Sequence, residues 1–277
     1  MAKKERIDVL LVERGLVETR EKAKRSIMAG LVFSGTERVD RPGMKVDREI
    51  PLEVKGNPLP YVSRGGLKLE KAIEVFQLSL QDKIVIDIGA STGGFTDCSL
   101  QNGAKAVYSL DVGYNQLAWK LRQDDRVIVM ERTNFRYVKP EDLVEGLPQF
   151  ATIDVSFISL KLILPVLKTL LVPNSDVVAL VKPQFEAGRE QVGKKGIVRE
   201  KSIHEQVVTG IAEFALEQGF DVSGLSFSPI KGGEGNIEFL MHLHFTGDKQ
   251  IGEMVSQLSA NEVVDSAHLE LKEKKED

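Results

Sequence analysis

The chain of 277 residues is 42% hydrophobic and 28% charged, with a formal net charge of −4. This is an ordinary globular composition, and the length allows a sizeable core and more than one domain. No apolar run approaches the roughly 20 residues that span a bilayer, and residues 1–15 lack the long apolar segment of a signal peptide. The single cysteine, Cys98, excludes an internal disulfide. We therefore expect a cytoplasmic protein without a membrane partner.

The net charge conceals a basic beginning and an acidic end. Residues 1–60 carry thirteen Lys or Arg against ten acidic residues. Residues 248–277 carry four Lys against eight acidic residues, which accounts for the whole net charge. A basic excess of this size does not identify a nucleic-acid-binding protein, although clustered bases matter more than the total. We expect residues 248–277 to form an acidic tail, either a solvated helix or a frayed terminus.

Residues 6–54 have the pattern of a small domain in which helices precede short strands. A first helix is predicted to end at Gly15, and a second to begin after Thr19 as its N-cap and to end at Gly30. Short β-like runs follow, separated by turn residues.

The second predicted helix carries a basic face. Arg20 and Lys24 are four residues apart and share one face, whereas Ala23 and Ile27 share another. A basic face backed by an apolar one suits RNA binding. An ordinary solvated charged face is the alternative that the helix alone leaves open.

This segment resembles the S4 domain, an RNA-binding fold. The chain has Phe33 to Gly35 where members of that family commonly carry Val-Asn-Gly. The resemblance implies a small N-terminal α+β domain, for which we take residues 1–56. The matching residues are Arg6, Ile7, Asp8, Leu11, Gly15, Leu16, Thr19, Arg20, Ala23, Ile27, Gly30 and Val32. The predicted RNA contacts are Arg6, Arg20, Lys24 and Arg25, together with Arg64 beyond this domain.

Residues 56–66 contain two prolines and three glycines and are expected to form a linker. Beyond them, apolar runs rich in β-branched residues alternate with helical patterns. This alternation predicts an α/β domain, doubly wound, with a mostly parallel sheet covered on both faces. The predicted strands lie at 83–89, 106–112, 126–131, 150–157 and 176–182, and two further β-like runs at 222–230 and 237–245 complete a domain over residues 57–247.

A glycine-rich turn, "DIGASTGG" at residues 87–94, follows the first of these strands. It is not the dinucleotide fingerprint, because Ala90 and Ser91 stand where the second glycine is needed, and it lacks the Gly-Lys-Ser/Thr of a P-loop. Doubly wound sheets bind ligands at the carboxyl ends of their strands. The acid at Asp87 suits a cationic group better than a phosphate, which points to S-adenosylmethionine with its ammonium and sulfonium.

Two more polar residues follow the next strands. Asp111 could accept both ribose hydroxyls of an adenosine, and Asn134 could contact an adenine edge. Strand-end or helix-capping roles are the alternative for Asp87 and Asp111. The predicted cofactor contacts are Asp87, Gly89, Ser91, Gly93, Gly94, Phe95, Asp111 and Asn134.

Four residues at predicted strand or loop edges carry the candidate chemistry: Lys68, Asp154, Lys182 and Glu238. Each alone is compatible with a solvated strand end, although Lys182 follows an apolar run that should be buried. Together they reproduce the Lys-Asp-Lys-Glu order of the FtsJ-like 2′-O-ribose methyltransferases.

From Arg6 to about Phe245 the chain resembles the hemolysin A (TlyA) family of rRNA methyltransferases. The motifs are "YVSRGGLKL", "DIGASTGGFTD", "DVGYNQLAW", "TIDVSFISL" and "LVKPQFE". The resemblance implies a seven-stranded sheet of the Rossmann-like methyltransferase type, S-adenosylmethionine as cofactor, and methyl transfer to a cytidine ribose of ribosomal RNA. Ribosomal subunits are the implied partner. Neither the nucleotide nor the oligomeric state follows from the resemblance.

The four side chains suit that chemistry. A ribose 2′-OH is a poor nucleophile, so its proton must leave or its developing charge must be stabilised. Lys182, partly desolvated and near Lys68, could act as general base or as a cation beside the forming alkoxide. Asp154 and Glu238 would orient the lysines while pushing their pKa values upward. No metal is expected, because the four histidines form no ligand cluster in the sequence.

Three other functions remain to be weighed. A non-catalytic RNA- or ribosome-binding factor is disfavoured by the intact set of four residues. A membrane-lysing toxin is disfavoured because the sequence has no strongly basic amphipathic stretch. A small-molecule O-methyltransferase would leave the S4-like segment without a role.

Overall fold

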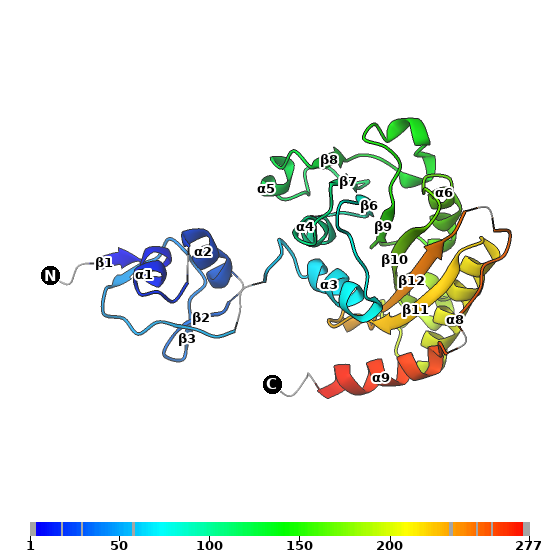
Figure 1. Cartoon of the computed structure of the whole chain (residues 1–277). Helices are drawn as coiled ribbons and strands as arrows, with labels where there is room; N and C mark the ends of the chain where they lie inside the picture. The colour runs from blue at the N-terminus through cyan, green and yellow to red at the C-terminus, as the bar shows by residue number, and fades with distance from the viewer. Residues whose placement is uncertain are drawn as a thin grey trace. The chain divides into compact units, whose positions relative to one another are not determined.

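A computed structural model describes residues 4–17, 19–28, 30–56, 59–232, 235–247, 249–255 and 257–273. The chain divides into two compact units, Met1–Pro60 and Tyr61–Asp277 (Figure 1). Within the described ranges, no helix is long and apolar enough to cross a membrane.

The first unit is a small α+β fold. Its elements are β1 (Lys4–Arg6), α1 (Ile7–Glu13), α2 (Arg20–Met28), β2 (Val32–Ser34), β3 (Glu37–Arg38), β4 (Lys45–Asp47) and β5 (Glu53–Val54). Strand β1 pairs with β4, and β2 lies between β3 and β5, all antiparallel. Ala23 and Ile27 of α2 are fully buried while Lys24 is exposed, so the two faces of this helix differ as expected.

The second unit is built around one twisted sheet. In the described part of the chain this sheet has seven strands, in the order β11-β12-β10-β9-β6-β7-β8. The strands are β6 (Ile84–Ile88), β7 (Ala106–Leu110), β8 (Val127–Met130), β9 (Phe150–Ile153), β10 (Ser175–Val181), β11 (Asp221–Phe227) and β12 (Phe239–Phe245). The helices are α3 (Gly65–Phe76), α4 (Gly94–Gln101), α5 (Trp119–Arg122), η1 (Phe135–Tyr137), η2 (Pro140–Asp142), η3 (Leu160–Leu162), α6 (Leu164–Lys168), α7 (Pro183–Glu186), η4 (Arg189–Gln191), α8 (Lys201–Glu217) and α9 (Ala260–Glu273). The expected doubly wound α/β fold is thus confirmed.

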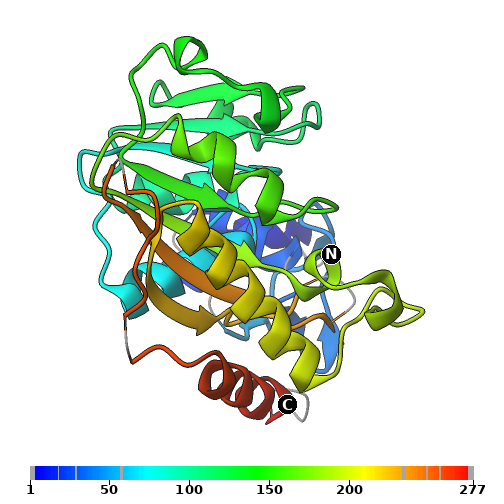
Figure 2. The ribbon, with the colours of Figure 1, turned by 90° about the vertical axis from the view of Figure 1, so that its right-hand side faces the viewer.

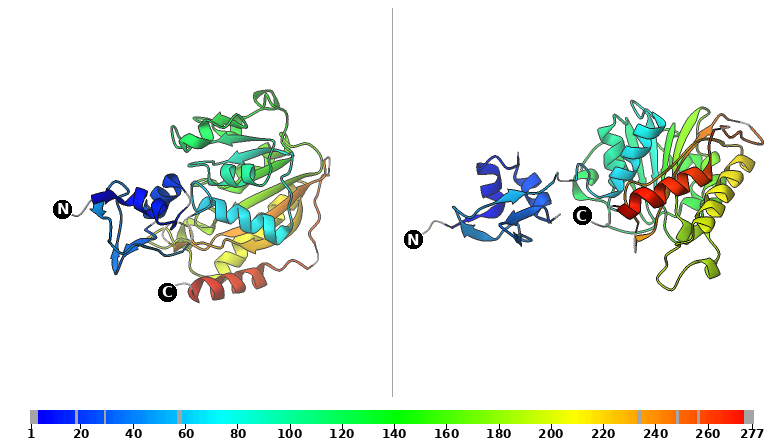
Figure 3. Two further views of the ribbon diagram at one scale, coloured as in Figure 1. Left: turned by 60° about the vertical axis from the view of Figure 1, so that its left-hand side comes forward. Right: turned by 90° about the horizontal axis from the view of Figure 1, so that it is seen from below.

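Helices cover both faces of the sheet. Figure 2 shows α6 and α8 in front of one face, and the left panel of Figure 3 shows α3 and α4 in front of the other. Successive strand residues point to opposite faces, so each strand must be apolar on both sides, and every residue of β6, β7 and β9 is buried. This double coverage explains why the strands read as continuous apolar runs.

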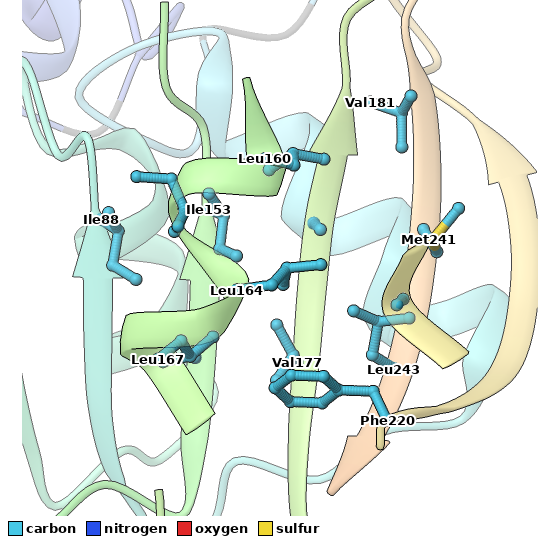
Figure 4. Close-up of a cluster of buried hydrophobic side chains, with 14 of the residues drawn as sticks. Ile88, Ile153, Leu160, Leu164, Leu167, Val177, Val181, Phe220, Met241 and Leu243 are labelled. Carbon is cyan, nitrogen blue, oxygen red and sulfur yellow. The ribbon is translucent and has the colours of Figure 1, made fainter. Parts of the chain in front are cut away.

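The larger core lies between the sheet and the α6/α8 layer. In Figure 4, Ile153 and Val177 of the sheet lie beside Leu164 and Leu167 of α6, and Met241 of β12 belongs to the same buried cluster. All five are fully buried. Burying a side chain of this size contributes roughly 1.5–3 kcal/mol each.

The C-terminal segment differs from the expected acidic tail. Helix α9 packs on α8 and β11, and Val264, Ala267 and Leu271 join the main core. His268 of α9 forms a buried 2.9 Å hydrogen bond with His204 of α8. The spacing of the three apolar residues gives one side of the helix an apolar stripe, which the acidic composition of the segment conceals. Residues 274–277 lie outside the described residues.

Candidate active site

Four polar side chains meet at one edge of the sheet. Asp154 follows β9 and Lys182 follows β10, and these parallel strands end at the same edge. Strand β12 is antiparallel to β10, with Val181 opposite Phe239, so Glu238 lies beside Lys182 as β12 begins. Successive side chains along a strand point to opposite faces of the sheet, and those of Asp154, Lys182 and Glu238 all point to the face that α3 covers. Lys68, on α3, completes the group, which we call the Lys-Asp-Lys-Glu cluster.

The cluster is a chain of alternating charges. Nζ of Lys182 lies 2.5 Å from Oδ1 of Asp154, and Nζ of Lys68 lies 3.5 Å from Oδ2 of the same carboxylate. Lys68 also lies 2.6 Å from Oε2 of Glu238. Lys68 and Lys182 are each 8% exposed and Glu238 is 2% exposed. Buried charges are costly unless they are paired, and each of these has a partner of opposite charge.

Two neutral side chains that no sequence motif indicated, those of Ser156 and Gln184, extend the cluster. Nζ of Lys182 donates to Oγ of Ser156 at 3.2 Å, and Nε2 of Gln184 donates to Oε1 of Glu238 at 3.4 Å. Ser156 lies two residues after Asp154, and Gln184 lies two residues after Lys182. Their position near the ends of these strands was the only feature of the sequence that could have indicated a role in the site.

The pKa of Lys68 is shifted by opposing effects. Burial lowers it, but the carboxylates of Asp154 and Glu238 raise it, and the net direction is upward. At Lys68 the carboxylates therefore raise the pKa by more than burial lowers it, which answers a question that the sequence left open. This residue stays an ammonium at neutral pH, which makes it a fixed positive charge instead of a proton acceptor.

A cavity of about 500 Å³ adjoins the cluster, within the range of ligand sites in proteins. It lies at the carboxyl ends of β6, β7, β8 and β9. Asp154 and Ser156 line it and also contact Lys182, so the cavity opens on the cluster. The lining residues are Ile88, Gly89, Ser91, Leu110, Asp111, Val112, Gln116, Asn134, Phe135, Arg136, Asp154, Val155, Ser156, Phe157, Ile158 and Ile163.

Two of the predicted cofactor residues in this lining present polar groups. Asp111 is half-buried, and its carboxylate accepts from the backbone N–H of Ser91 at 2.8 Å and of Gly113 at 2.7 Å. Each carboxylate oxygen can accept further bonds, as ribose hydroxyls would require. Asn134 caps η1 by accepting from the Arg136 N–H at 3.1 Å, which leaves its amide N–H groups as the possible ligand donors.

The glycine turn approaches the backbone of Asp154 closely. Gly89 has φ of +87°, and a Cβ there would come within 2.5 Å of the Asp154 carbonyl oxygen. Ser91, with φ of +49°, holds the turn in the left-handed region although it is not glycine. Only glycine at position 89 permits this contact between the turn and the end of β9.

Asp87 does not line the cavity, contrary to the direct ligand contact expected from the sequence. Its carboxylate is fully buried and accepts from the hydroxyls of Thr96 at 2.7 Å and Thr152 at 3.0 Å. Burial raises the pKa of Asp87 to about 7, against the lowering effect of these hydrogen bonds. The residue ties β6 to α4 and β9 below the turn.

The remaining predicted cofactor residues also lie outside the lining. A Cβ on Gly93 would overlap the side chains of Leu117 and Leu121, and one on Gly94 would overlap Ser63 and the first residues of α3, so both glycines permit close packing. Phe95 is 3% exposed and belongs to the core between the sheet and α3.

The predicted RNA-binding residues fall into two groups. Arg6 and Arg20 both pair with the buried Asp8, at 2.9 and 3.0 Å. Lys24 and Arg25 are exposed and form no ion pair with any residue that the structure describes.

Arg64, the fifth predicted RNA contact, lies in the second unit. It is exposed at the N-cap of α3, four residues before Lys68, and is therefore near the start of the helix that supplies one cluster residue. Over the described ranges, no group of three or more His, Cys, Asp or Glu side chains is arranged to hold a metal.

Known proteins resemble both units. The model of the FtsJ-like methyltransferase family matches residues 61–245, and that of the S4 domain matches residues 5–49. The chain is 67% identical over 276 residues to "Putative rRNA methyltransferase YqxC" of Bacillus subtilis, covering 100% of this chain and 98% of that one. It is 39% identical over 274 residues to "16S/23S rRNA (cytidine-2'-O)-methyltransferase TlyA" of Mycobacterium tuberculosis, covering 99% of each. A solved structure, "Putative hemolysin from Streptococcus thermophilus", superposes with a TM-score of 0.78 at 61% identity over 100% of both chains.

Proposed function

Since the chain belongs to the FtsJ-like methyltransferase family, we propose that it transfers a methyl group from S-adenosylmethionine to a ribose 2′-hydroxyl of ribosomal RNA, on a cytidine. One observation carries the proposal: the Lys-Asp-Lys-Glu cluster opens, through Asp154 and Ser156, on a cavity suited to the cofactor. A methyl donor and a group that activates the acceptor must lie side by side in such an enzyme.

The cavity offers groups that match S-adenosylmethionine. Asp111 presents a carboxylate held by two backbone amides, which suits the ribose hydroxyls of the adenosine. Asn134 offers amide donors for the adenine, and Gly89 lets the backbone approach the ligand beside Asp154. When bound, the cofactor supplies an electrophilic methyl group.

The cluster residues have distinct roles in this proposal. Lys182 contacts Asp154 and Ser156, two of the residues that line the cavity, so its Nζ is placed to take the hydroxyl proton or to stabilise the oxygen as that atom gains charge. Asp154 orients Lys182. Glu238 holds the ammonium of Lys68, which remains charged. This ammonium in turn holds the Asp154 carboxylate in place.

The S4 domain supplies RNA affinity and not chemistry. We take residues 1–56 as this domain, 57–247 as the methyltransferase domain and 248–277 as a C-terminal extension that contributes α9. Lys24 and Arg25, exposed on α2, would contact phosphates. Ribosomal RNA in ribosomal subunits is the proposed partner, and the cytoplasm the proposed location.

The experiment that tests the function maps ribose methylation on ribosomal RNA from cells with and without the gene. Purified protein with S-adenosylmethionine should then restore the missing methyl group on subunits from the deleted strain. The Lys182→Ala protein serves as control, since it should bind but not methylate. Identical methylation maps in the two strains would contradict the proposal.

The runner-up function is a non-catalytic ribosome-binding factor with the same fold. It would not require three buried charges, those of Lys68, Lys182 and Glu238, to be kept together with the half-buried Asp154 beside a cavity, because burying charges is costly in a protein interior. If the protein were such a binding factor, the purified protein would bind ribosomal subunits but would leave every ribose unmethylated.

A further inference from the structure

A basic loop projects from the second unit next to the catalytic residues. It comprises residues 188–199, between α7 and α8, and we call it the arm. In Figures 2 and 3 this yellow-green segment stands away from the body of the unit. It contains four basic residues against the single acid Glu190, in a chain whose net charge is −4. The basic residues are Arg189, Lys194, Lys195 and Arg199, all of them exposed.

The basic side chains of the arm are not neutralised by acidic residues in the part of the chain that the structure describes. Across the described ranges, none of its four basic side chains forms an ion pair. Lys194 and Lys195 occupy the two central positions of a turn that the Gly196 N–H closes on the Gly193 carbonyl at 2.8 Å. Gly196 has φ of +69°, as the end of this turn requires. The turn therefore presents two adjacent lysines at its tip.

The arm is fastened to the catalytic edge by side chains from two other elements. Asn236, two residues before Glu238 and 3% exposed, donates through Nδ2 to the Gly196 carbonyl at 2.8 Å and accepts at Oδ1 from the Val198 N–H at 3.1 Å. Nε2 of His204 donates to the Val198 carbonyl at 3.1 Å. Both backbone groups of Val198 are thus satisfied by buried side chains.

From these contacts we propose that the arm is a second RNA-binding element, which grips the phosphate backbone of the substrate from within the catalytic unit. Exposed, unpaired lysines and arginines bind phosphates by releasing counterions. Fixing them in advance on a fastened loop reduces the ordering cost of binding. The arm rests on the proposed function for its substrate, and it acts in addition to the S4 domain.

The test compares Lys194→Glu, Lys195→Glu and the double variant with the wild-type enzyme. The matched control for each single variant is Lys105→Glu, which makes the same charge change at an exposed residue on the opposite edge of the sheet, just before β7. Affinity for ribosomal subunits is measured at several salt concentrations, together with KM and kcat for methylation and affinity for S-adenosylhomocysteine.

We expect the double variant to lose subunit affinity by on the order of 10-fold or more and to show a shallower dependence of log K on log salt, because two bases that release counterions from phosphates are removed. KM should rise while kcat and cofactor affinity stay unchanged, and Lys105→Glu should behave as wild type. Unchanged affinity and salt slope would overturn the proposal. A salt-independent loss would indicate a protein contact instead of phosphate, and a fall in kcat alone would indicate a role in chemistry; either would also overturn it.

Asn236 tests whether the fastening matters, as a positioning residue. Asn236→Ala should weaken subunit binding and expose Lys194 and Lys195 to faster cleavage by trypsin. Combined with the double variant, it should cause little further loss of affinity, because both changes remove the same contact. Additive losses would show that Asn236 acts independently of the arm. If the wild-type protein binds subunits through the arm but methylates nothing, the proposed function fails while this inference stands.

Discussion

Oδ1 of Asp154 holds the ammonium of Lys182 at 2.5 Å. The other oxygen of this carboxylate faces Lys68 at 3.5 Å, so one acid is shared by two lysines. Lys182 also reaches Ser156, which lines the cavity. The position of Lys182 is therefore set by contacts on the cavity side, where a substrate oxygen would lie.

Replacing Lys182 should separate binding from catalysis. Lys182→Ala should reduce the single-turnover rate of methylation by about 10²–10⁴-fold, because a group that acts on the reacting oxygen matters chiefly in the transition state. Lys182→Arg should fail almost as badly, since a guanidinium stays charged and cannot accept a proton. Affinities for subunits and for S-adenosylhomocysteine should not change in either variant. Near-normal turnover in Lys182→Ala would favour the non-catalytic binding factor.

Asp111 should carry more cofactor affinity than Asp87. Asp111→Ala removes a carboxylate that lines the cavity and should weaken binding of S-adenosylhomocysteine by about 10–150-fold, as expected for hydrogen bonds to a charged group. Calorimetry measures the loss. Asp125→Ala is the control, because Asp125 is an exposed acid outside the cavity lining. Equal affinities in the two variants would place the adenosine elsewhere.

Asp87 should instead affect the pH dependence of stability. Its pKa rises from 3.8 to about 7 on folding because the carboxyl is buried. Between these values the folded state binds more protons than the unfolded state, so this residue makes the free energy of unfolding fall as pH rises from about 4 to about 7. The loss amounts to about 4 kcal/mol at most.

Asp87→Asn removes this titration. Relative to wild type, the variant should therefore gain stability as pH rises through that window, which urea denaturation at a series of pH values measures. Wild-type and variant curves that run parallel across the window would show that Asp87 is ionised in both states.

The bases of α2 should differ in what they contribute. Lys24→Glu with Arg25→Glu should weaken RNA binding in a salt-dependent way without loss of stability, because both side chains are exposed. Arg20→Glu should also destabilise the first unit, since it places a carboxylate beside the buried Asp8. Lys45→Glu, at an exposed position on β4, is the charge-matched control for each single variant, Lys24→Glu or Arg25→Glu. If it weakens RNA binding as strongly as the α2 changes, total charge and not this helix determines affinity.

Helix α9 offers a test of its packing with two leucines. Leu271 is 3% exposed in the main core, whereas Leu269 is 65% exposed. Leu271→Ala should lower the free energy of unfolding by about 2–5 kcal/mol, and Leu269→Ala should change it by less than about 0.5 kcal/mol. Similar small effects from both would mean that α9 is the solvated helix its composition suggests.

The sequence predicts the architecture better than the environment of single side chains. The alternation of elements predicts the doubly wound sheet, and the order of Lys68, Asp154, Lys182 and Glu238 anticipates residues that the fold brings together. Asp87 shows the limit. Its neighbours in β6 face one core layer, so its own side chain must face the other, and a sheet covered on both faces leaves it buried beneath α4.

The same limit applies to the glycines and to α9. A glycine signals close approach but not what approaches, and Gly93 and Gly94 admit neighbouring protein side chains where a ligand was expected. The acidic composition of residues 260–273 predicts a solvated helix. The three apolar positions indicate a packed helix only once the structure places them against α8. For the glycines and for α9 alike, the environment is set by residues that are distant in the sequence.

The placement of Glu238 has a consequence for how the enzyme matures. Its partner Lys68 is 170 residues away in the chain, whereas the cavity is lined only by residues between Ile88 and Ile163. The cavity can thus form once β6 to β9 have assembled, but the charge cluster is complete only after β12 has inserted between β10 and β11. Such distant pairings form slowly. The lining of the cavity therefore does not depend on β12, whereas catalytic competence requires β12 to bring Glu238 to Lys68.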